Sequence, residues 1–192
     1  MHGIIDLPAF EQWVYTDKEL GRELTDDFYL DLLALNYKKS GAKYELFHLL
    51  EQHVNMGEYG TYKLKWLLDD ARQRTLELPG KLEQFYDLYC NGYSFLGVLG
   101  MGYGLLVNYL SPPYKVERWD ELTQSELAEL VDSFSPHLEV EIDRVERWLN
   151  TGKIILTGEI NELGHYMYID NRTTDERQVR FDFPVFNEQP KR

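Results

Sequence analysis

The chain has 192 residues, of which 43% are hydrophobic and 14% aromatic, so it can bury a core and disorder is not expected over most of its length. Its 33 acidic and 20 basic side chains give a formal charge of −13. An acidic surface repels nucleic-acid phosphates and anionic membranes, because affinity for them depends on lysine and arginine. Composition therefore predicts no nucleic-acid or membrane partner. A basic protein partner fits the charge, although solubility alone also explains it.

Cysteine content and the N-terminal sequence bear on the compartment. The single cysteine, Cys90, excludes an intramolecular disulfide and a cysteine-based zinc site. Cys90 falls on a predicted apolar stripe of a helix, so we expect its thiol to be buried. The start of the chain, residues 1–6, lacks the basic region and long apolar run of a secretory signal. These features together predict a cytoplasmic protein.

The first half of the chain shows helical periodicity. Pro8 is predicted in the first turn of a short helix, Thr16 with Glu19 is predicted to cap a second, and Thr25 to open a third. A fourth helix follows Gly41. Its predicted apolar stripe consists of Tyr44, Phe47, Leu50 and Val54.

A turn is predicted next, at Gly57 and Gly60. From Thr61 the apolar spacing predicts a helix of about 17 residues that ends before Pro79. The next helical stripe consists of Leu82, Phe85, Tyr86 and Tyr89. Thr123 and Ser125 are candidate caps of a later helix.

The last predicted helix runs from Pro136 to Gly152, after which the hydrophobic period changes to two. Segments 153–157 and 165–170 are predicted strands, and 179–183 a third. The sequence therefore predicts one α+β domain over residues 1–192. It consists of a mostly helical, bundle-like body at 1–151, a small C-terminal antiparallel β-meander at 152–186 and a frayed tail at 187–192.

The segment 93–110 is rich in glycine and carries no charge over 18 residues. That length reaches the lower limit for a membrane span, but its four glycines disfavour a long exposed helix. The order GxxGxGxG also matches no nucleotide-binding loop. We expect a buried helix or a pair of broken helices in which glycine permits close backbone approach. Phe95, Leu99 and Leu106 should then be buried, and Gly100 or Gly102 should touch neighbouring backbone.

Some short patterns in the chain resemble parts of catalytic or metal-binding motifs. Glu45 and His48 form one ExxH pair, but the second ExxH, residues 162–165, lies in a glycine turn, so a di-metal site on facing helices is disfavoured. Adjacent carboxylates, as in 26–27 and 69–70, diverge by about 100° on a helix and do not flank one substrate atom. The sequence therefore predicts no metal, no cofactor and no catalytic residue, and it favours a protein that is not an enzyme.

The segment 117–146 holds ten carboxylates together with Trp119, and Trp148 follows it. Acidic residues beside exposed aromatics suit a protein that covers a basic cleft, because charge steers association and aromatic rings anchor the contact. The simpler interpretation, which the pattern alone favours, is a solvated helical face whose tryptophans point into the core. On the first interpretation the partner-binding residues are Glu117, Trp119, Asp120, Glu121, Glu139, Asp143 and Glu146.

Three stretches carry a resemblance to known proteins: FEQWVY at residues 10–15, FYDLYCNGYSFLGVLGMGYGL at 85–105 and KIILTGEINELGHYMYIDNR at 153–172. In these stretches, and in size and charge, the chain resembles small acidic bacterial immunity proteins that neutralise polymorphic toxins. The resemblance implies cytoplasmic action by binding, without catalysis.

Two specific functional hypotheses follow, and a stand-alone structural or regulatory interaction module is a further possibility. The first is a non-catalytic acidic binding protein, a toxin-neutralising immunity protein that covers a basic partner surface. The alternative is a small enzyme or ligand-binding protein with a pocket between the glycine-rich segment 93–110 and the β-meander. The sequence leaves the identity of the partner and the oligomeric state open.

Overall fold

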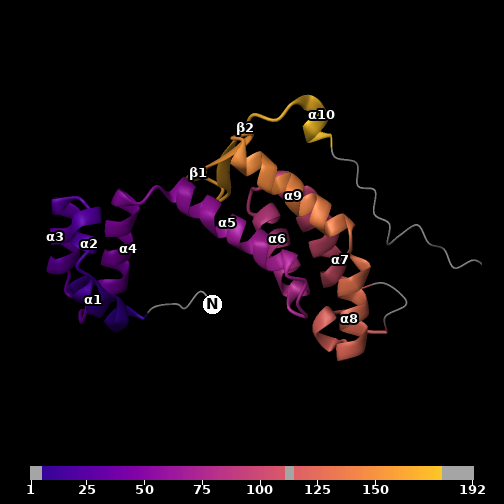
Figure 1. Ribbon diagram of the computed structural model, residues 1–192, viewed down its shortest axis with the longest axis horizontal. Helices are drawn as coiled ribbons and strands as arrows, with labels where there is room; N and C mark the ends of the chain where they lie inside the picture. Colours follow the sequence, from indigo (N-terminus) through magenta and orange to yellow (C-terminus); the bar gives the residue numbers. More distant parts are fainter. Residues whose placement is uncertain (1–5, 111–114, 179–192) are drawn as a thin grey trace, which may run out of the picture. The chain divides into compact units, whose positions relative to one another are not determined.

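The computed structural model describes residues 6–110 and 115–178. The chain divides into two compact units, Met1–Asn55 and Met56–Arg192, and each is described by itself (Figure 1). Helices dominate the described residues, and a two-stranded antiparallel sheet lies near the C-terminal end. The predicted fold class, α+β with a mostly helical body, is confirmed. The single-domain organisation over residues 1–192 stays a prediction.

The first unit is a group of short helices around a small apolar core. Its described helices are α1 (Leu7–Thr16), α2 (Leu20–Glu23), α3 (Asp26–Ala34) and α4 (Ala42–His53). Their buried side chains form one cluster: Val14, Leu20, Phe28, Leu32, Tyr37 and Leu46. Helices of this length are not stable alone in water, so this shared burial holds the unit together.

Asp17, and not Thr16, organises the start of α2. Thr16 is the last residue of α1, and its hydroxyl donates to the carbonyl oxygen of Gln12 at 2.8 Å. The Asp17 carboxylate accepts the backbone N–H groups of Glu19 and Leu20 at 2.9 and 3.2 Å. The capping box predicted at Thr16 and Glu19 is therefore wrong, because α1 extends through Thr16.

Helix α4 buries a different stripe from the predicted one. Ala42 and Leu46 are buried, whereas the side chains of Tyr44 and Phe47 are 68% and 52% exposed. The helix carries two apolar stripes at helical spacing, and periodicity does not say which of them faces the core. The exposed stripe keeps a local aromatic contact, with the rings of Tyr44 and His48 4.3 Å apart edge to face.

The second unit begins with α5 (Met56–Arg72) and α6 (Leu78–Cys90). A 3-10 turn, η1 (Ser94–Leu96), a π-helix, η2 (Val98–Gly104), and the short α7 (Leu105–Asn108) follow. After them come η3 (Trp119–Glu121), α8 (Gln124–Ser133) and α9 (His137–Asn150). These elements share one large apolar core, whose most buried side chains include Leu68, Leu82, Phe85, Leu96, Leu99, Leu138 and Ile142.

Helices α8 and α9 begin where the sequence predicts. Thr123 caps α8 in a capping box with Glu126, and α9 follows Pro136. Gly152, which has a φ of 68°, stands two residues beyond the end of α9. These boundaries depend on local capping chemistry, so the sequence alone identifies them.

Helix α5 starts and ends earlier than predicted. Gly57 and Gly60, predicted as a turn, lie inside it, and it ends at Arg72 instead of Leu78. A Cβ atom at Gly57 would lie 2.2 Å from the carbonyl oxygen of Leu156. The absence of a side chain at Gly57 therefore lets the sheet approach the backbone of the helix.

The glycine-rich segment 93–110 forms broken helices with close backbone approach, as predicted. A Cβ atom at Gly100 would lie 2.8 Å from the carbonyl oxygen of Phe85, and one at Gly104 would lie 2.5 Å from that of Leu82. The π-helix η2 is therefore in backbone contact with α6. Neither glycine can accept a side chain without a shift of one of these two elements.

Burial around this segment follows the prediction in part. Phe95 and Leu99 are buried, as expected, whereas Leu106 is only partly buried. Cys90 is exposed, so the predicted buried thiol is wrong. Cys90 lies five positions beyond the buried Phe85, about 140° away around the helix, and therefore faces away from the core.

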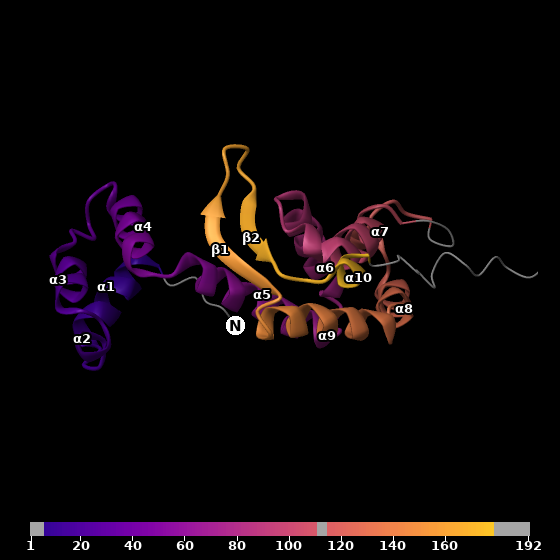
Figure 2. The ribbon, with the colours of Figure 1, turned by 90° about the horizontal axis from the view of Figure 1, so that it is seen from above.

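Strands β1 (Ile154–Ile160) and β2 (Tyr166–Asp170) form the predicted antiparallel hairpin (Figure 2). The register shifts within β1, where Gly158 takes a φ of 77°. A Cβ atom at Gly158 would lie 2.6 Å from the backbone nitrogen of Gly57. Gly158, which the sequence assigns to the connection between the strands, thus bends β1 against the start of α5.

The C-terminal part of the prediction is tested only as far as residue 178. The third strand predicted at 179–183 and the frayed tail predicted at 187–192 lie outside the described residues. A short helix that the sequence analysis did not predict, α10 (Thr174–Arg177), follows the sheet. Thr173 and Glu176 form its capping box.

Two alanine substitutions in α5 test the contact between this helix and β1. Gly57→Ala places a methyl group against the Leu156 carbonyl oxygen, so we expect it to lower the unfolding free energy by about 1–3 kcal/mol. Gly60→Ala is the matched control, because its Cβ would lie at an ordinary 3.6 Å from the Leu156 side chain. Alanine at this position should raise the unfolding free energy by up to about 1 kcal/mol. Urea denaturation followed by circular dichroism measures both, and equal effects of the two substitutions would contradict the close approach.

Candidate functional site

The acidic face predicted on α9 is paired with arginine from within the chain. Arg72, the last residue of α5, donates to Asp143 at 2.6 Å and to Glu146 at 2.7 Å. The hydrogen bond to Asp143 is the largest cause of a raised pKa of the Arg72 guanidinium, and the charge of Glu146 adds to it. These two carboxylates therefore connect α9 to the end of α5.

Arg74 makes a second connection of this kind. Its guanidinium lies 3.1 Å from Asp132 and 3.4 Å from Glu139. The backbone of Arg74 is in the left-handed region, with a φ of 51°, which disfavours a non-glycine residue by about 1–2 kcal/mol. The two ion pairs offset part of that strain. Glu139 thus joins Asp143 and Glu146 as a predicted partner-binding residue that already has a cationic partner.

The other four predicted partner-binding residues lie at or beside η3. Glu117, Asp120 and Glu121 are exposed, and Arg118 donates to Asp120 at 3.1 Å. Trp119 is half-buried and packs against the apolar core of its unit. Glu117 and Glu121 form no ion pair with any residue that the structure describes.

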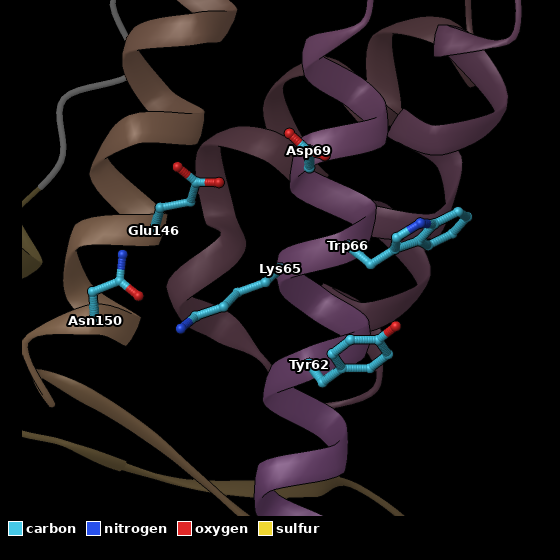
Figure 3. A pocket seen from close by; sticks show the side chains of 6 residues that line it. All are labelled: Tyr62, Lys65, Trp66, Asp69, Glu146 and Asn150. Atoms are coloured by element: carbon cyan, nitrogen blue, oxygen red, sulfur yellow. The ribbon is translucent and has the colours of Figure 1, made fainter. Parts of the chain in front are cut away.

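A shallow, open hollow of about 330 Å³ lies between α5 and α9 (Figure 3). Its lining consists of Tyr62, Lys65, Trp66 and Asp69 from α5 and of Glu146 and Asn150 from α9. The four α5 residues recur at i, i+3, i+4 and i+7 and so share one face of the helix. Figure 3 shows Lys65 extending toward α9, whereas the rings of Tyr62 and Trp66 project away from α9.

Charges of both signs surround this hollow. The ammonium group of Lys81 lies 5.5 Å from the ring centre of Trp66 and 2.7 Å from the carboxylate of Asp70. Within the described part of the chain, neither Lys65 nor Asp69 forms an ion pair. None of the residues predicted from the sequence to bind a partner lies on this face of α5. The sequence does contain a signal for it, because Tyr62 and Trp66 stand at helical spacing among charged residues. Both lie on the side of α5 opposite its leucines.

A carboxylate nearer the start of α9 is buried. Glu141 is only 3% exposed, and loss of hydration raises its pKa to about 7. Arg144, at 2.6 Å, and Arg172 act in the opposite direction. The pKa of Tyr103, in η2, is raised to about 12, first by burial and then by the charge of Glu141. The core of this unit therefore contains a carboxyl group that titrates near neutral pH.

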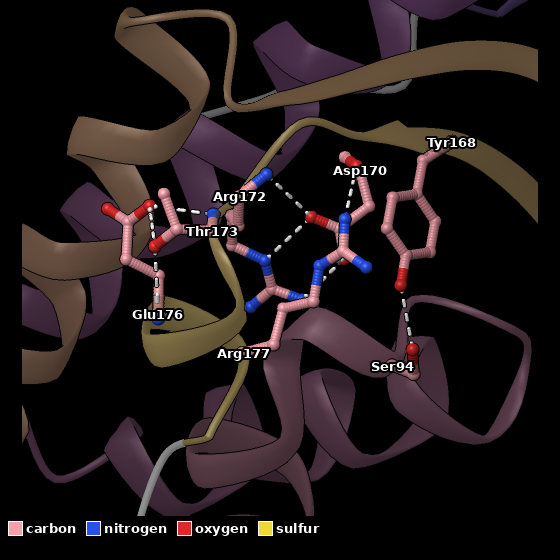
Figure 4. A network of polar contacts seen from close by, with 7 residues as sticks. All are labelled: Ser94, Tyr168, Asp170, Arg172, Thr173, Glu176 and Arg177. Carbon is pink, nitrogen blue, oxygen red and sulfur yellow. Dashed lines mark hydrogen bonds and ion pairs between the residues drawn. The ribbon is translucent and has the colours of Figure 1, made fainter.

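A polar network fixes the segment that follows β2 (Figure 4). Arg172 makes two hydrogen bonds to the Asp170 carboxylate, at 3.0 and 2.9 Å, and the hydrogen bond from Arg172 is the largest cause that lowers the pKa of Asp170. The same guanidinium lies 4.5 Å from the ring centre of Trp148. Trp148 is thus a buried packing residue, in agreement with the simpler interpretation of the acidic segment.

Aromatic side chains pack between the glycine-rich segment and the sheet, where the alternative hypothesis places a pocket. The ring centres of Tyr93 and Tyr166 are 5.1 Å apart, and those of Phe95 and Tyr168 are 5.0 Å apart. The hydroxyl groups of Ser94 and Tyr168 share a hydrogen bond of 2.7 Å (Figure 4). These contacts make the region a packed interface.

The residues that the structure describes contain no group of three or more histidine, cysteine, aspartate or glutamate side chains placed to hold a metal. In the ExxH pair, Glu45 lies beside Lys39 at 2.5 Å, and His48 lies 3.1 Å from Glu51. His53 stacks on Phe28 with ring centres 4.1 Å apart.

Comparisons with protein-family models, with curated proteins and with solved structures found no match to the chain. Among residues 6–110 and 115–178, no helix is both long and apolar enough to cross a membrane.

Substitution of Arg72 tests whether its ion pairs with Asp143 and Glu146 stabilise the fold. We expect Arg72→Gln to lower the unfolding free energy by about 1 kcal/mol at low salt, and by less in 1 M NaCl, because partly exposed ion pairs are screened. Lys63→Gln, an exposed change of the same charge on the same helix, is the control and should have little effect. Equal urea midpoints for the two variants would show that Asp143 and Glu146 do not depend on Arg72.

The buried carboxyl of Glu141 predicts a pH dependence of stability. Its pKa is about 7 in the folded chain against 4.5 for an ordinary glutamate, so between these values the folded state binds more protons than the unfolded state. Stability from this group is therefore lost as the pH rises from 4.5 to about 7. Glu141→Gln should flatten that decline in thermal melts, whereas the exposed control Glu129→Gln should not. Parallel stability curves for wild type and Glu141→Gln would contradict the raised pKa.

Proposed function

We propose that the chain is a non-catalytic acidic binding protein that covers a basic surface of a protein partner, as a toxin-neutralising immunity protein does. The observation that carries the proposal is the presence of exposed carboxylates without an internal cationic partner. Such groups attract a basic protein over distances of about a Debye length and so speed its association. The resemblance of the sequence to small acidic immunity proteins supports the same class of partner.

In the first unit these carboxylates lie on and just before α3. This unit has ten acidic and five basic side chains. Glu23, Asp26, Asp27 and Asp31 are exposed and form no ion pair with a described residue. Leu30, between two of them, is 60% exposed. An exposed apolar side chain with carboxylates one turn before it on the same helix matches the composition of a contact that is steered by charge and desolvated at its centre.

In the second unit the corresponding groups lie at η3 and on α8. Glu117 and Glu121 flank the ion pair of Arg118 and Asp120, and Glu129 is exposed on α8. Glu139, Asp143 and Glu146 differ from them, because Arg72 and Arg74 already neutralise part of their charge. We therefore assign the steering of a basic partner in this unit mainly to the residues around η3.

The test begins with capture of a partner from cells of the native host on the immobilised full chain, followed by its identification and purification. Association is then measured by stopped flow at about 20 and 300 mM NaCl. We expect the combined reversals Asp26→Lys, Asp27→Lys and Asp31→Lys, or Glu117→Lys, Asp120→Lys and Glu121→Lys, to slow association tenfold or more at low salt, with a smaller effect at high salt.

The matched control changes the same number of charges in the opposite direction. Lys18→Glu, Lys38→Glu and Lys43→Glu alter exposed lysines of the first unit and should speed association. The captured partner should arrest growth when expressed alone and not when expressed with the chain. An acidic partner, association that does not depend on salt, or a partner without effect on growth would contradict the proposal.

A further inference from the structure

We infer that the hollow between α5 and α9 receives a lysine or arginine side chain of the basic partner. This inference rests on the proposed function and assigns one contact within it. The hollow offers the chemistry that a cationic side chain requires, namely aromatic faces for its charge and carboxylates for its hydrogen bonds.

The aromatic and acidic groups come from one face of α5. Asp69 is one turn beyond Trp66 and two turns beyond Tyr62, and all three line the hollow. The Tyr62 side chain is 58% exposed, so a partner side chain can reach its ring. Figure 3 shows Asp69 one turn beyond Trp66 on α5, with both rings projecting away from α9. A guanidinium or ammonium group on this face would meet an aromatic ring and a carboxylate together.

The surrounding surface already binds cations through its carboxylates, and in one case beside an aromatic ring. Arg72 lies between Asp143 and Glu146, and Lys81 lies over the Trp66 ring while it contacts Asp70. Each of these cations pairs with a carboxylate of α5 or α9. The hollow repeats this combination at a position that a partner can reach.

Lys65 opposes the binding of a second cation, so its removal distinguishes a cationic ligand from an anionic one. It lines the hollow, forms no ion pair with a described residue and extends toward α9 in Figure 3. If the hollow receives a cation, the Lys65 charge repels it, and its removal tightens binding. If the hollow instead receives an anion, Lys65 supplies the attraction, and its removal weakens binding. Asp69, which forms no ion pair with a described residue, and the net charge of −13 favour the cation, although Arg72 already neutralises part of the charge of Glu146.

The test uses the full chain and small probes at constant ionic strength. N-acetyl-arginine N-methylamide and inorganic phosphate are titrated separately, and the indole N–H signal of Trp66, identified by its loss in Trp66→Phe, is followed by NMR. We expect a saturable shift with the arginine probe in the millimolar range, which corresponds to about −4 kcal/mol. Lys65→Gln should lower the dissociation constant about threefold or more, and Asp69→Asn should raise it by a similar factor.

Asp87→Asn, an exposed change on α6, is the matched control and should leave the titration unchanged. Absence of a saturable shift, a larger response to phosphate, or weaker arginine binding by Lys65→Gln would each overturn the inference. Its failure is distinguishable from that of the proposed function. Salt-dependent association of a basic partner without probe binding would overturn the inference and leave the proposed function. Probe binding without any basic partner would overturn the proposed function and leave a cation-binding hollow whose natural ligand is not that partner.

Discussion

Backbone contact at glycine is the constraint on which the second unit depends. At Gly57 the sheet touches the start of α5, and at Gly100 and Gly104 the π-helix touches α6. Because β1 follows α9 after a short connection, contact of β1 with the start of α5 brings α9 alongside that helix. The alignment places Arg72 opposite Asp143 and Glu146 and creates the hollow between the two helices.

The same alignment divides the acidic residues of this unit into two groups. Carboxylates of α9 that face the end of α5 meet Arg72 and Arg74 and contribute to the connection between the helices. Glu117 and Glu121, beside η3, have no such partner among the described residues and remain exposed to solvent. A net charge of −13 therefore does not spread evenly over possible contact surfaces, and paired carboxylates attract a partner less than unpaired ones do.

Features set by local chemistry could be predicted from the sequence. Thr123 with Glu126 caps α8, Pro136 precedes α9, and the alternation after Gly152 gives the hairpin. Features set by distant contacts could not. Gly57 signals a turn in sequence, but it is a packing residue because Leu156, far along the chain, lies against it.

The candidate site shows the same limit. Asp143 and Glu146 belong to an acidic segment in sequence, but both are paired with Arg72, which is 71 and 74 residues away. Their availability to a partner therefore depends on a distant residue. In helix α4 the sequence does not decide which of two apolar stripes faces the core. The predicted stripe, with Tyr44 and Phe47, is exposed. The α5 face of the hollow was predictable in principle, because Tyr62 and Trp66 stand at helical spacing among charged residues.

Carboxyl footprinting of the full chain, alone and in complex with its basic partner, tests the central claim most directly. A carbodiimide with a neutral amine labels carboxylates, and mass spectrometry locates the label. The account predicts rapid labelling of Asp26, Asp27, Asp31, Glu117 and Glu121 in the free chain, slower labelling of Glu146 beside Arg72, and protection of the first five in the complex. Protection confined to α9, or labelling of those five that the partner leaves unchanged, would contradict it.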